Sequence, residues 1–556
     1  MPAADAAALL RRNATDPGIS DRPAVRSDDR IWTHAELVAE ASRYANLLLA
    51  HRPADRAPHV AVLLDNLPEY LFALGGGALS GGAVVGLNHT RRGEHLLRDI
   101  AHTDIDLVIT EPRHAELLAP IRDELSVPVY VVGGSLENAL AAAGSGDPGV
   151  EPGPDTLWAL IFTSGTSSAP KAVICSHRRL LVTGNRMGII MDLGPDDVGY
   201  ICMPLFHSNA LMVGWAPSIV YGASIGLAPR FSASRWLPDV RHYGSTYFNY
   251  TGKPLAYILS TAEQPDDADN PLRVAFGNEG SPEIVAEFAR RFGVDVIDAY
   301  GATEGGVAVD RDAAEREGAL GKAPPHIKVL DDDGNEKPPA RLDRDGRLQN
   351  AEDCVGEIVN TAGVGPFEGY YNNPVANARM TRFGWYWTGD LGYLDEDRYL
   401  YFAGRDADWL RVDGENFPAG PIEAEIARYP DVVQAVVYGV PDDQAGDQVM
   451  AGLVLREGAG TIDLDDFASW VDAQPGLGPK WRPRYVRVLH DPPTTGTNKI
   501  LKRTLVHQKF RADRTSGDPV FVRGRGEERY RRFTANDENE LRKSFGANGR
   551  ERFWDL

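Results

Sequence analysis

The chain has 556 residues, of which 25% are charged and 43% are hydrophobic, and its formal net charge is −21. This length is too great for a single hydrophobic core, so we expect two or more domains. The acidic balance argues against nucleic acid or an anionic membrane surface as a general partner. An anionic substrate would therefore have to be attracted by local donors.

The cysteines and the N-terminus indicate the compartment. Cys175, Cys202 and Cys354 are widely spaced and odd in number, which is typical of reduced, buried thiols in a cytoplasmic protein. No CxxC or paired His/Cys motif predicts a metal site, so any metal is expected to arrive with a nucleotide. Residues 1–12 lack the basic segment and apolar core of a secretory signal. We expect a cytoplasmic protein.

The N-terminal half alternates between helical and strand patterns. Thr33 and Glu36 predict a capped helix that runs to Leu47, and 59–64 and 107–110 read as buried strands. The alternation recurs after residue 199, which predicts doubly wound α/β layers. The uncharged stretch 71–87 is interrupted by glycines, so it predicts a buried helix, a turn and a short strand instead of a membrane span.

The C-terminal half has a different texture. Short strands separated by Asp/Gly turns predict a small β-rich subdomain over about 321–403, and a further compact α/β unit follows. Within the subdomain, strands are expected at 327–330 and 356–359. After it, a helix is expected at 421–428 and a strand at 432–439.

A loop rich in Ser, Thr and Gly follows the apolar run 157–162. Residues 163–171 read Thr-Ser-Gly-Thr-Ser-Ser-Ala-Pro-Lys, and such a loop exposes N–H and hydroxyl donors that could surround a polyphosphate. Lys171 adds a mobile positive charge. The spacing is not that of a Walker loop, because no glycine precedes Lys171 and Ala172 follows it. Taken alone, such a loop is more often a plain surface turn.

This loop resembles the phosphate-binding signature of the acyl-adenylate-forming (AMP-binding) ligase superfamily. Other segments match that superfamily's nucleotide, ribose, hinge and C-terminal lysine signatures in the same order: Asp-Ala-Tyr-Gly-Ala-Thr-Glu at 298–304, Tyr-Trp-Thr-Gly-Asp at 386–390, Gly-Arg-Asp-Ala-Asp at 404–408 with Gly-Glu-Asn at 414–416, and Thr-Asn-Lys-Ile-Leu-Lys at 497–502. The resemblance covers roughly residues 20 to 510.

The resemblance implies an α/β fold in which a large N-terminal domain is followed by a small, mobile C-terminal domain. We expect an N-terminal adenylate-forming domain over 1–404, which includes the β-rich subdomain, and a mobile C-terminal α+β domain over 405–513. Residues 514–556 carry mixed charges, and we expect them to be an extension packed on the surface and only partly ordered.

The reaction implied is activation of a carboxylate by ATP, with release of pyrophosphate, followed by transfer of the acyl group from the adenylate to CoA. The texture of 204–209, 270–279 and 409–416 is most similar to actinobacterial fatty-acyl-CoA synthetases, so a fatty or aryl acid is expected. A related branch activates nitrite to diazotise an aromatic amine, and this alternative stays open. The acyl acceptor and the oligomeric state are open too, a homodimer being one option.

The resemblance assigns the phosphates to one loop and the base to two others. The residues that would cradle the phosphates are Thr163, Ser164, Gly165, Thr166, Ser167 and Lys171. Those that would surround the base are Gly277, Asn278, Glu279, Gly280, Asp298, Ala299, Tyr300 and Gly301. Within this set Tyr300 would stack on adenine and Asp298 would accept from its amino group. The phosphate-binding loop at 163–171 departs from the superfamily's usual pattern at Ser168, where glycine is common.

Five further residues receive roles by the same resemblance. Thr303 would contact the α-phosphate, and Glu304 would be the magnesium ligand, since a single carboxylate suits Mg²⁺. Asp390 would accept from the ribose hydroxyls, with help from Arg405. Lys499 would stabilise the transition state of adenylation.

Other positions have both a functional and a structural interpretation. His207 lies at the mouth of the expected carboxylate site, although a lone histidine is more often a satisfied core residue. Ala407 departs from the acidic or lysine residue common at the hinge, and Gly414–Asn416 resembles the loop used in thioester formation. Candidate pocket walls, which could equally be plain core, are Met212, Trp215, Tyr247 and Phe248.

Two readings from other classes compete. Gly222-Ala223-Ser224-Ile225-Gly226 fits the GxSxG elbow of a hydrolase, but Pro229 interrupts the helix that must follow. A nucleotide-binding module without catalysis is disfavoured because the residues expected to do the chemistry are all present: Lys171, Glu304, Asp390, Arg405 and Lys499.

Overall fold

A computed structural model describes the chain from residue 3 to residue 554 with gaps. The positions outside the described residues are 1–2, 29, 92, 164–170, 279, 281, 311–315, 317, 343–347, 406–408, 413–414, 444–446, 457, 460, 475–476, 495–499, 525, 549, 552–553 and 555–556. The chain divides into two compact units. The first unit comprises Met1–Arg311 and Val364–Thr381, and the second comprises Asp312–Gly363 and Arg382–Leu556.

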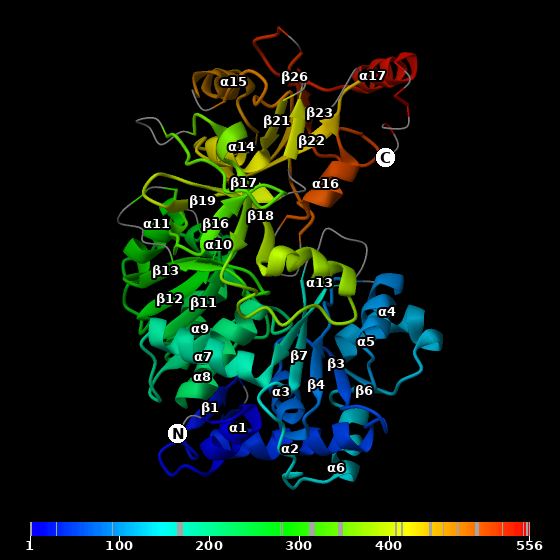
Figure 1. Ribbon diagram of the computed structural model, residues 1–556, viewed down its shortest axis with the longest axis vertical. Coiled ribbons are helices and arrows are strands. Elements are labelled where there is room, and N and C mark those ends of the chain that lie inside the picture. Colours follow the sequence, from blue (N-terminus) through cyan, green and yellow to red (C-terminus); the bar gives the residue numbers. More distant parts are fainter. Residues whose placement is uncertain are drawn as a thin grey trace. The chain divides into compact units, whose positions relative to one another are not determined.

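The first unit contains two predominantly parallel sheets, as the alternating pattern predicts (Figure 1). The six-stranded sheet has the order β6-β5-β3-β4-β7-β8, with β3 (His59–Leu63), β4 (Ala83–Gly86), β5 (Leu107–Thr110), β6 (Val129–Val131), β7 (Leu157–Phe162) and β8 (Ala172–Ser176). The eight-stranded sheet has the order β14-β13-β12-β11-β9-β10-β1-β2, with β1 (Pro23–Arg26), β2 (Ile31–Thr33), β9 (Val198–Ile201), β10 (Ser224–Leu227), β11 (Tyr247–Thr251), β12 (Val274–Asn278), β13 (Asp295–Gly301) and β14 (Ala308–Asp310). β8, β14 and β2 pair antiparallel with their neighbours.

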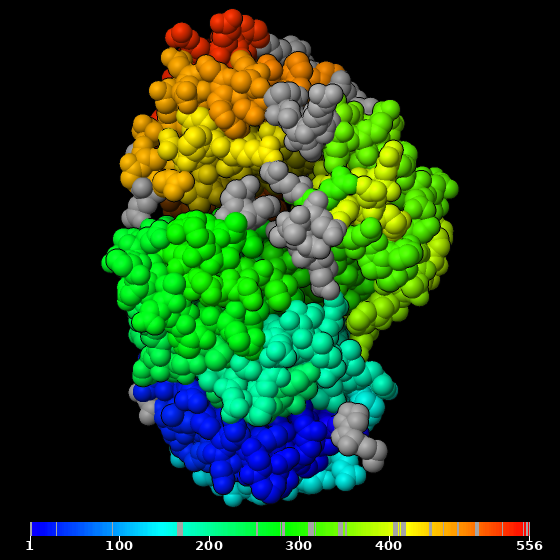
Figure 2. Space-filling view, turned by 90° about the vertical axis from the view of Figure 1, so that its left-hand side faces the viewer, coloured from blue at the N-terminus to red at the C-terminus, as the bar shows by residue number. Residues whose placement is uncertain are grey.

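Helices connect these strands and cover the sheets. They are α1 (Ala6–Thr15), α2 (His34–Ala50), α3 (Pro68–Ser80), α4 (Gly93–His102), α5 (Pro112–Leu118), α6 (Ser135–Ala143), α7 (His177–Ile190), α8 (Ala216–Tyr221), α9 (Ala233–Tyr243), α10 (Gly252–Leu259), α11 (Pro282–Phe292) and α13 (Pro374–Met380), with a 3₁₀ helix at Ala119–Glu124 and a π-helix at Asn209–Trp215. The blue, cyan and green segments of this unit form a closely packed surface (Figure 2).

The glycine-rich stretch explains how α3 packs against α2. The predicted capping box at the start of α2 is present, with Thr33 and Glu36 each bonded to the other's backbone. A Cβ atom added at Gly76 would lie 2.6 Å from Cβ of Tyr44, so the two helices approach too closely for a larger residue. The expected buried helix and strand are therefore confirmed as α3 and β4. Among the described residues no helix is long and apolar enough to cross a membrane.

The second unit contains the predicted β-rich segment and a further α/β segment. The first is a five-stranded sheet of order β15-β19-β18-β17-β16, with β15 (Gly321–Lys322), β16 (Ile327–Leu330), β17 (Gly356–Asn360), β18 (Tyr386–Leu394) and β19 (Tyr399–Arg405). The remaining strands are the pair β20 (Trp409–Val412) and β21 (Glu415–Pro418), and the sheet β22 (Val432–Pro441), β23 (Asp447–Leu455), β24 (Tyr485–Val488), β25 (Val520–Val522) and β26 (Arg531–Arg532). The helices are α12 (Ala351–Cys354), α14 (Ala419–Ile426), α15 (Leu464–Ala473), α16 (Lys502–Gln508) and α17 (Ala535–Ala547). A domain boundary between residues 404 and 405 stays a prediction.

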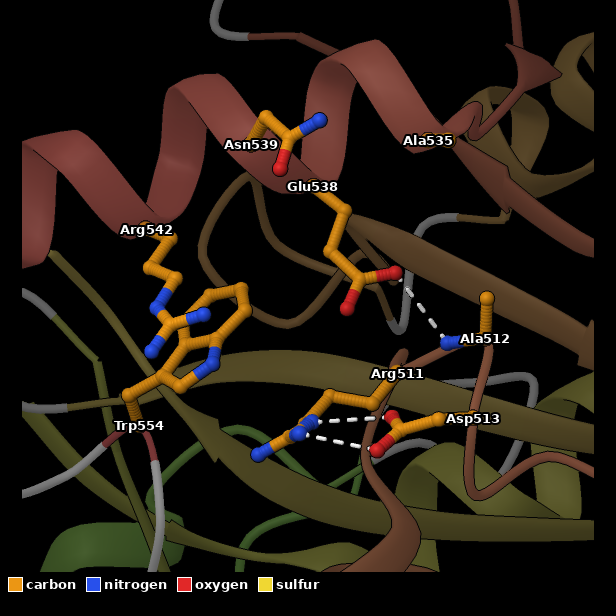
Figure 3. Close-up of a pocket in the computed structure, with 8 residues that line it drawn as sticks. All are labelled: Arg511, Ala512, Asp513, Ala535, Glu538, Asn539, Arg542 and Trp554. Carbon is orange, nitrogen blue, oxygen red and sulfur yellow. Dashed lines mark hydrogen bonds and ion pairs between the residues drawn. The ribbon is translucent and has the colours of Figure 1, made fainter.

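The C-terminal extension differs from our expectation of a surface appendage. β25 pairs with β24 and β26, so residues 520–522 form an inner strand of the last sheet. Phe545 and Trp554 are buried in a cluster with Tyr438 of β22. Beside Trp554, α17 borders a shallow pocket of about 260 Å³ (Figure 3). The extension is thus part of the C-terminal hydrophobic core.

Candidate functional site

The predicted phosphate loop lies between two paired strands. β7 and β8 pair antiparallel, and the amide of Thr163 donates to the carbonyl of Lys171 at 3.0 Å, which closes the base of the loop. The predicted residues Ser164 to Ser167 lie outside the described residues. At the far end of the loop, Nζ of Lys171 lies 5.5 Å from the centre of the Tyr370 ring.

The predicted metal ligand, Glu304, contacts the same tyrosine. Its side chain is buried, and its Oε1 accepts a 2.7 Å hydrogen bond from the hydroxyl of Tyr370. The structure therefore places Tyr370 between Lys171 and Glu304, two residues that the sequence analysis assigned to one phosphate site. Sequence reasoning did not single out Tyr370, because it lies 66 positions beyond Glu304 in the chain.

Thr303 is held by two neighbours. Its hydroxyl lies 2.8 Å from Oγ of Ser208, and its carbonyl accepts from the guanidinium of Arg179. Arg179 is buried on α7 and also donates to the carbonyl of Ile174 at 3.0 Å. Sequence reasoning missed Arg179, since nothing in its local pattern separates it from a surface arginine.

The predicted base-binding residues lie at the carboxyl ends of β12 and β13, where open α/β sheets bind ligands. Oδ2 of Asp298 accepts from the amide of Gly280 at 2.9 Å and from the hydroxyl of Tyr250 at 3.0 Å, so it joins the two strand ends. A Cβ atom at Gly277 would lie 2.3 Å from the carbonyl oxygen of Tyr250, which requires glycine there. Ala299, Tyr300 and Gly301 form the end of β13 and pair with β14. Glu279 lies outside the described residues.

Asn278 presents a buried acceptor at the end of β12. Its Oδ1 has no hydrogen-bond partner among the described residues. A buried polar atom normally has a partner, so this one points to a group that is supplied by a ligand or by a residue outside the description.

His207 is neutral at physiological pH. Burial, and secondarily the neighbouring His89, lowers its pKa to about 4. Its ring lies against Phe206, with ring centres 4.3 Å apart, and its Nε2 is buried without a partner among the described residues. The π-helix that carries the predicted pocket walls Met212 and Trp215 begins two residues later. Such helices are frequent at functional sites.

Two histidines and an aspartate that the sequence analysis did not single out form a cluster next to Phe206. Asp65, His89 and His114 follow β3, β4 and β5, and their ligand atoms lie within 4.8 Å of one another. His114 donates to Asp65 at 2.8 Å, and Arg113 pairs with the other oxygen of Asp65 at 2.6 Å. The two imidazole rings are parallel within 5°. One cation cannot lie in both ring planes at bonding distance, so the cluster as built is a hydrogen-bonded support and not a preformed metal centre.

The predicted ribose residue, Asp390, belongs to the second unit. It is buried on β18, and its amide donates to Oγ1 of Thr388 at 3.0 Å. Gly389 has a φ of +72°, which favours glycine, and its amide donates to Glu357 at 2.7 Å. Asp390 stands opposite Arg405 in the register of β18 and β19. The description does not include the Arg405 side chain, the predicted hinge residues 406–408 or Lys499. On either side of the segment that contains Lys499, Thr494 and Ile500 form an antiparallel bridge.

The structure excludes the hydrolase elbow. Ser224 begins the buried strand β10 and does not lie in a turn from strand to helix. Its Oγ accepts from Nε of Arg26 at 3.2 Å, with the serine side chain in the interior of the sheet. The GxSxG string is therefore structural.

Comparison with known proteins places these features in a family. The sequence model of the family described as AMP-binding enzyme matches residues 10–371. The sequence model of the family described as AMP-binding enzyme C-terminal domain matches residues 421–499. The steroid-22-oyl-CoA synthetase of Rhodococcus jostii is 46% identical over 96% of this chain and 96% of its own length. The medium/long-chain-fatty-acid–CoA ligase FadD17 of Mycobacterium tuberculosis is 46% identical over 88% of this chain and 93% of its own. The crystal structure of ATP-bound MatB from Rhodopseudomonas palustris is similar with a TM-score of 0.76 and 26% identity, over 91% of this chain and 98% of that one.

Proposed function

The chain belongs to the AMP-binding enzyme family and is an ATP-dependent, AMP-forming acyl-CoA ligase, and from this premise we propose that its substrate is a large apolar carboxylic acid of the fatty-acid or steroid side-chain class. The single observation that supports this class is the 46% identity, over nearly the whole chain, to a steroid-22-oyl-CoA synthetase. The buried apolar residues of the π-helix after His207 are compatible with such an acyl group.

In the first step, a carboxylate oxygen bonds to the α-phosphorus of ATP while the bond to the bridging oxygen breaks and pyrophosphate leaves. Two anions approach each other, so the site must neutralise charge and fix an in-line geometry. We assign the β- and γ-phosphates to the loop from Thr163 to Lys171. Thr303 is assigned to the α-phosphate, where its contact with Ser208 orients the hydroxyl.

A divalent cation fits Glu304. The residue offers a buried carboxylate with two oxygens, of which Oε1 accepts from Tyr370. Mg²⁺ prefers one or two carboxylates together with phosphate oxygens and water, which matches this donor set. When bound, the cation would neutralise charge on the phosphates.

The adenine base and the ribose are assigned to different residues. In the first unit, Tyr300 stacks on the base and Oδ1 of Asn278 accepts from its amino group, which satisfies a buried acceptor. Asp298 is engaged by Gly280 and Tyr250, so its contribution is to hold the loop in place. In the second unit, Asp390 accepts from the ribose hydroxyls and Arg405 assists.

In the second step, the thiolate sulfur of CoA bonds to the acyl carbonyl carbon, and the carbon–oxygen bond to AMP breaks. His207 borders the carboxylate. Because its pKa is about 4, it acts as a neutral hydrogen-bonding ring and not as a cation. Gly414–Asn416 is assigned to this thioester step. The nitrite-activating alternative gains no support from the comparisons.

A pyrophosphate-release screen tests the proposal. The panel contains long-chain fatty acids, steroid side-chain carboxylates, aryl acids, and nitrite with arylamines, each followed by mass spectrometry of the product formed with CoA. We expect release with the first two classes and a CoA thioester as product. Release with aryl acids alone, or with nitrite and no carboxylate, would contradict the proposed substrate class.

A further inference from the structure

Tyr370 contacts both the proposed cation ligand and the phosphate-loop lysine. Its hydroxyl donates to Oε1 of Glu304 at 2.7 Å, and Nζ of Lys171 lies 5.5 Å from its ring centre. Tyr370 is 2% exposed, so its ring and hydroxyl are shielded from bulk water. One buried side chain thus links the anionic and the cationic part of the site.

The fold fixes Tyr370 through the strand that follows the phosphate loop. Tyr370 forms an antiparallel bridge with Val173 of β8, and the amide of Ile174 donates to the carbonyl of Gly369 at 2.9 Å. β8 begins directly after Lys171. The ring and the lysine are therefore positioned by the same stretch of paired backbone.

We propose that Tyr370 is a positioning residue for the divalent cation that accompanies ATP. The inference rests on the proposed function, in which Glu304 is the cation ligand. The hydroxyl holds the carboxylate in one orientation before the cation binds, so less rotational freedom is lost on binding. The ring face attracts the ammonium of Lys171 and keeps it near the outer phosphates.

Substitution of Tyr370 by Phe tests the hydroxyl alone. Mn²⁺ binding is measured by electron paramagnetic resonance in the presence of the α,β-methylene analogue of ATP, which is not cleaved. We expect the Mn²⁺ dissociation constant to rise by about 10- to 100-fold, as for other partners of metal ligands. Pyrophosphate release should then require more Mg²⁺ and approach the parent rate at saturation.

Tyr371→Phe is the matched control, because the hydroxyl of the adjacent tyrosine donates to Asp104 at 2.8 Å and not to Glu304. Its Mn²⁺ dissociation constant should equal that of the parent. If Tyr370→Phe lowers the melting temperature but leaves Mn²⁺ binding unchanged, Tyr370 is a packing residue and the proposal is wrong.

Glu304→Gln separates this inference from the proposed function. Weaker Mn²⁺ binding in Glu304→Gln but not in Tyr370→Phe overturns the role of Tyr370 alone. Unchanged Mn²⁺ binding in both variants overturns the assignment of Glu304 and with it this inference, while carboxylate-dependent pyrophosphate release by the parent still supports the ligase function. An absence of such release by the parent would contradict the proposed function itself.

Discussion

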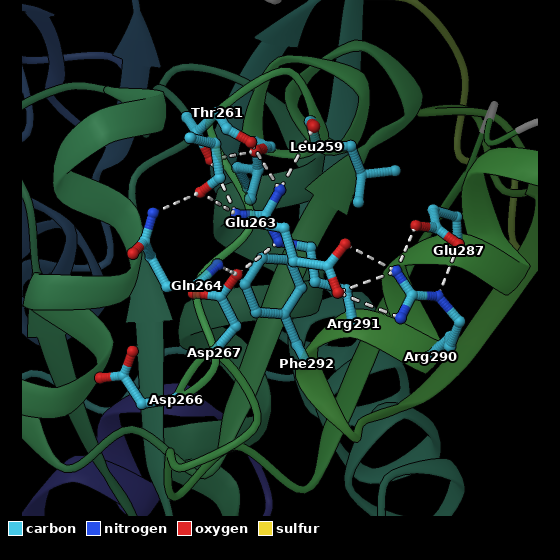
Figure 4. A network of polar contacts seen from close by, with 12 residues as sticks. Leu259, Thr261, Glu263, Gln264, Asp266, Asp267, Glu287, Arg290, Arg291 and Phe292 are labelled. Carbon is cyan, nitrogen blue, oxygen red and sulfur yellow. Dashed lines mark hydrogen bonds and ion pairs between the residues drawn. The ribbon is translucent and has the colours of Figure 1, made fainter.

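Nε of Arg291 lies 2.6 Å from Oδ2 of Asp267, and each side chain is 4% exposed. The same guanidinium donates to the carbonyl oxygens of Thr261 at 2.8 Å and Ala262 at 3.0 Å (Figure 4). Arg291 lies near the end of α11, whereas its partners lie in the connection between α10 and β12. One buried ion pair therefore fixes the connection that leads into β12, the strand that ends at Asn278.

Asp267→Ala should destabilise the first unit by about 3–5 kcal/mol, because it leaves a buried guanidinium without its carboxylate. Urea unfolding followed by circular dichroism measures the change. Glu287→Ala is the control, since it removes a partner of the exposed Arg290 and should have little effect. Equal midpoints for Asp267→Ala and the parent would contradict the structural role of the pair.

Two buried histidines predict a loss of stability in mild acid. Burial is the main cause that lowers the pKa values of His34 and His177 to about 4. An unfolded histidine is protonated below about pH 6.5, whereas the folded ones stay neutral down to about pH 4. The unfolded state then binds more protons, so the free energy of unfolding falls as the pH decreases through this window, by roughly 3 kcal/mol per histidine at its lower end.

Urea unfolding at several pH values between 4 and 7 measures this effect. His34→Gln keeps a donor for the carbonyl of Gly222, which lies 3.2 Å from Nε2 of His34, but removes the titration. The pH dependence of this variant should be shallower than that of the parent by about one proton. Parallel curves for the two proteins would show that His34 does not titrate as described.

Trp554 supports the second unit from the end of the chain. It is 3% exposed, and its ring centre lies 5.9 Å from that of Phe510 and 5.6 Å from that of Phe545. Trp554→Ala should cost about 3–5 kcal/mol by opening a cavity in this cluster. The control is Arg542→Ala, because Arg542 is exposed and lines the pocket that Trp554 also borders (Figure 3). This change should leave the free energy of unfolding, measured by calorimetry, nearly unchanged.

Local patterns were enough to predict many elements of the fold. The Thr33–Glu36 capping box, the short apolar strands and the glycine-interrupted helix α3 follow from spacing over a few residues. The C-terminal extension was misjudged because mixed charge hides the few apolar residues, such as Trp554, that join the core. Its role depends on partners far away in the sequence.

The site was predictable only where a short motif carries the chemistry. Lys171, Thr303 and Glu304 stand out by motif. Tyr370, which contacts Lys171 and Glu304, and Arg179, which contacts Thr303, lie in distant segments and have no local signal. Nor does sequence spacing predict that the segment after His207 is a π-helix.

Lys499→Ala should lower the rate of pyrophosphate release by about 10²- to 10³-fold, because the ammonium is assigned to charge that develops in the transition state. Nucleotide affinity should stay close to that of the parent, since the contact is made mainly in the transition state. Stopped-flow pyrophosphate release and equilibrium binding of the uncleaved ATP analogue measure the two quantities.

Lys502→Ala is the control for this prediction, because Nζ of Lys502 pairs with Glu423 at 2.9 Å and has no assigned part in the chemistry. Synthetic acyl-adenylate provides a second control. Lys499→Ala should still convert it to the CoA thioester, since Gly414–Asn416, and not Lys499, is assigned to that step. If Lys499→Ala releases pyrophosphate as fast as Lys502→Ala, then another residue stabilises the adenylation transition state.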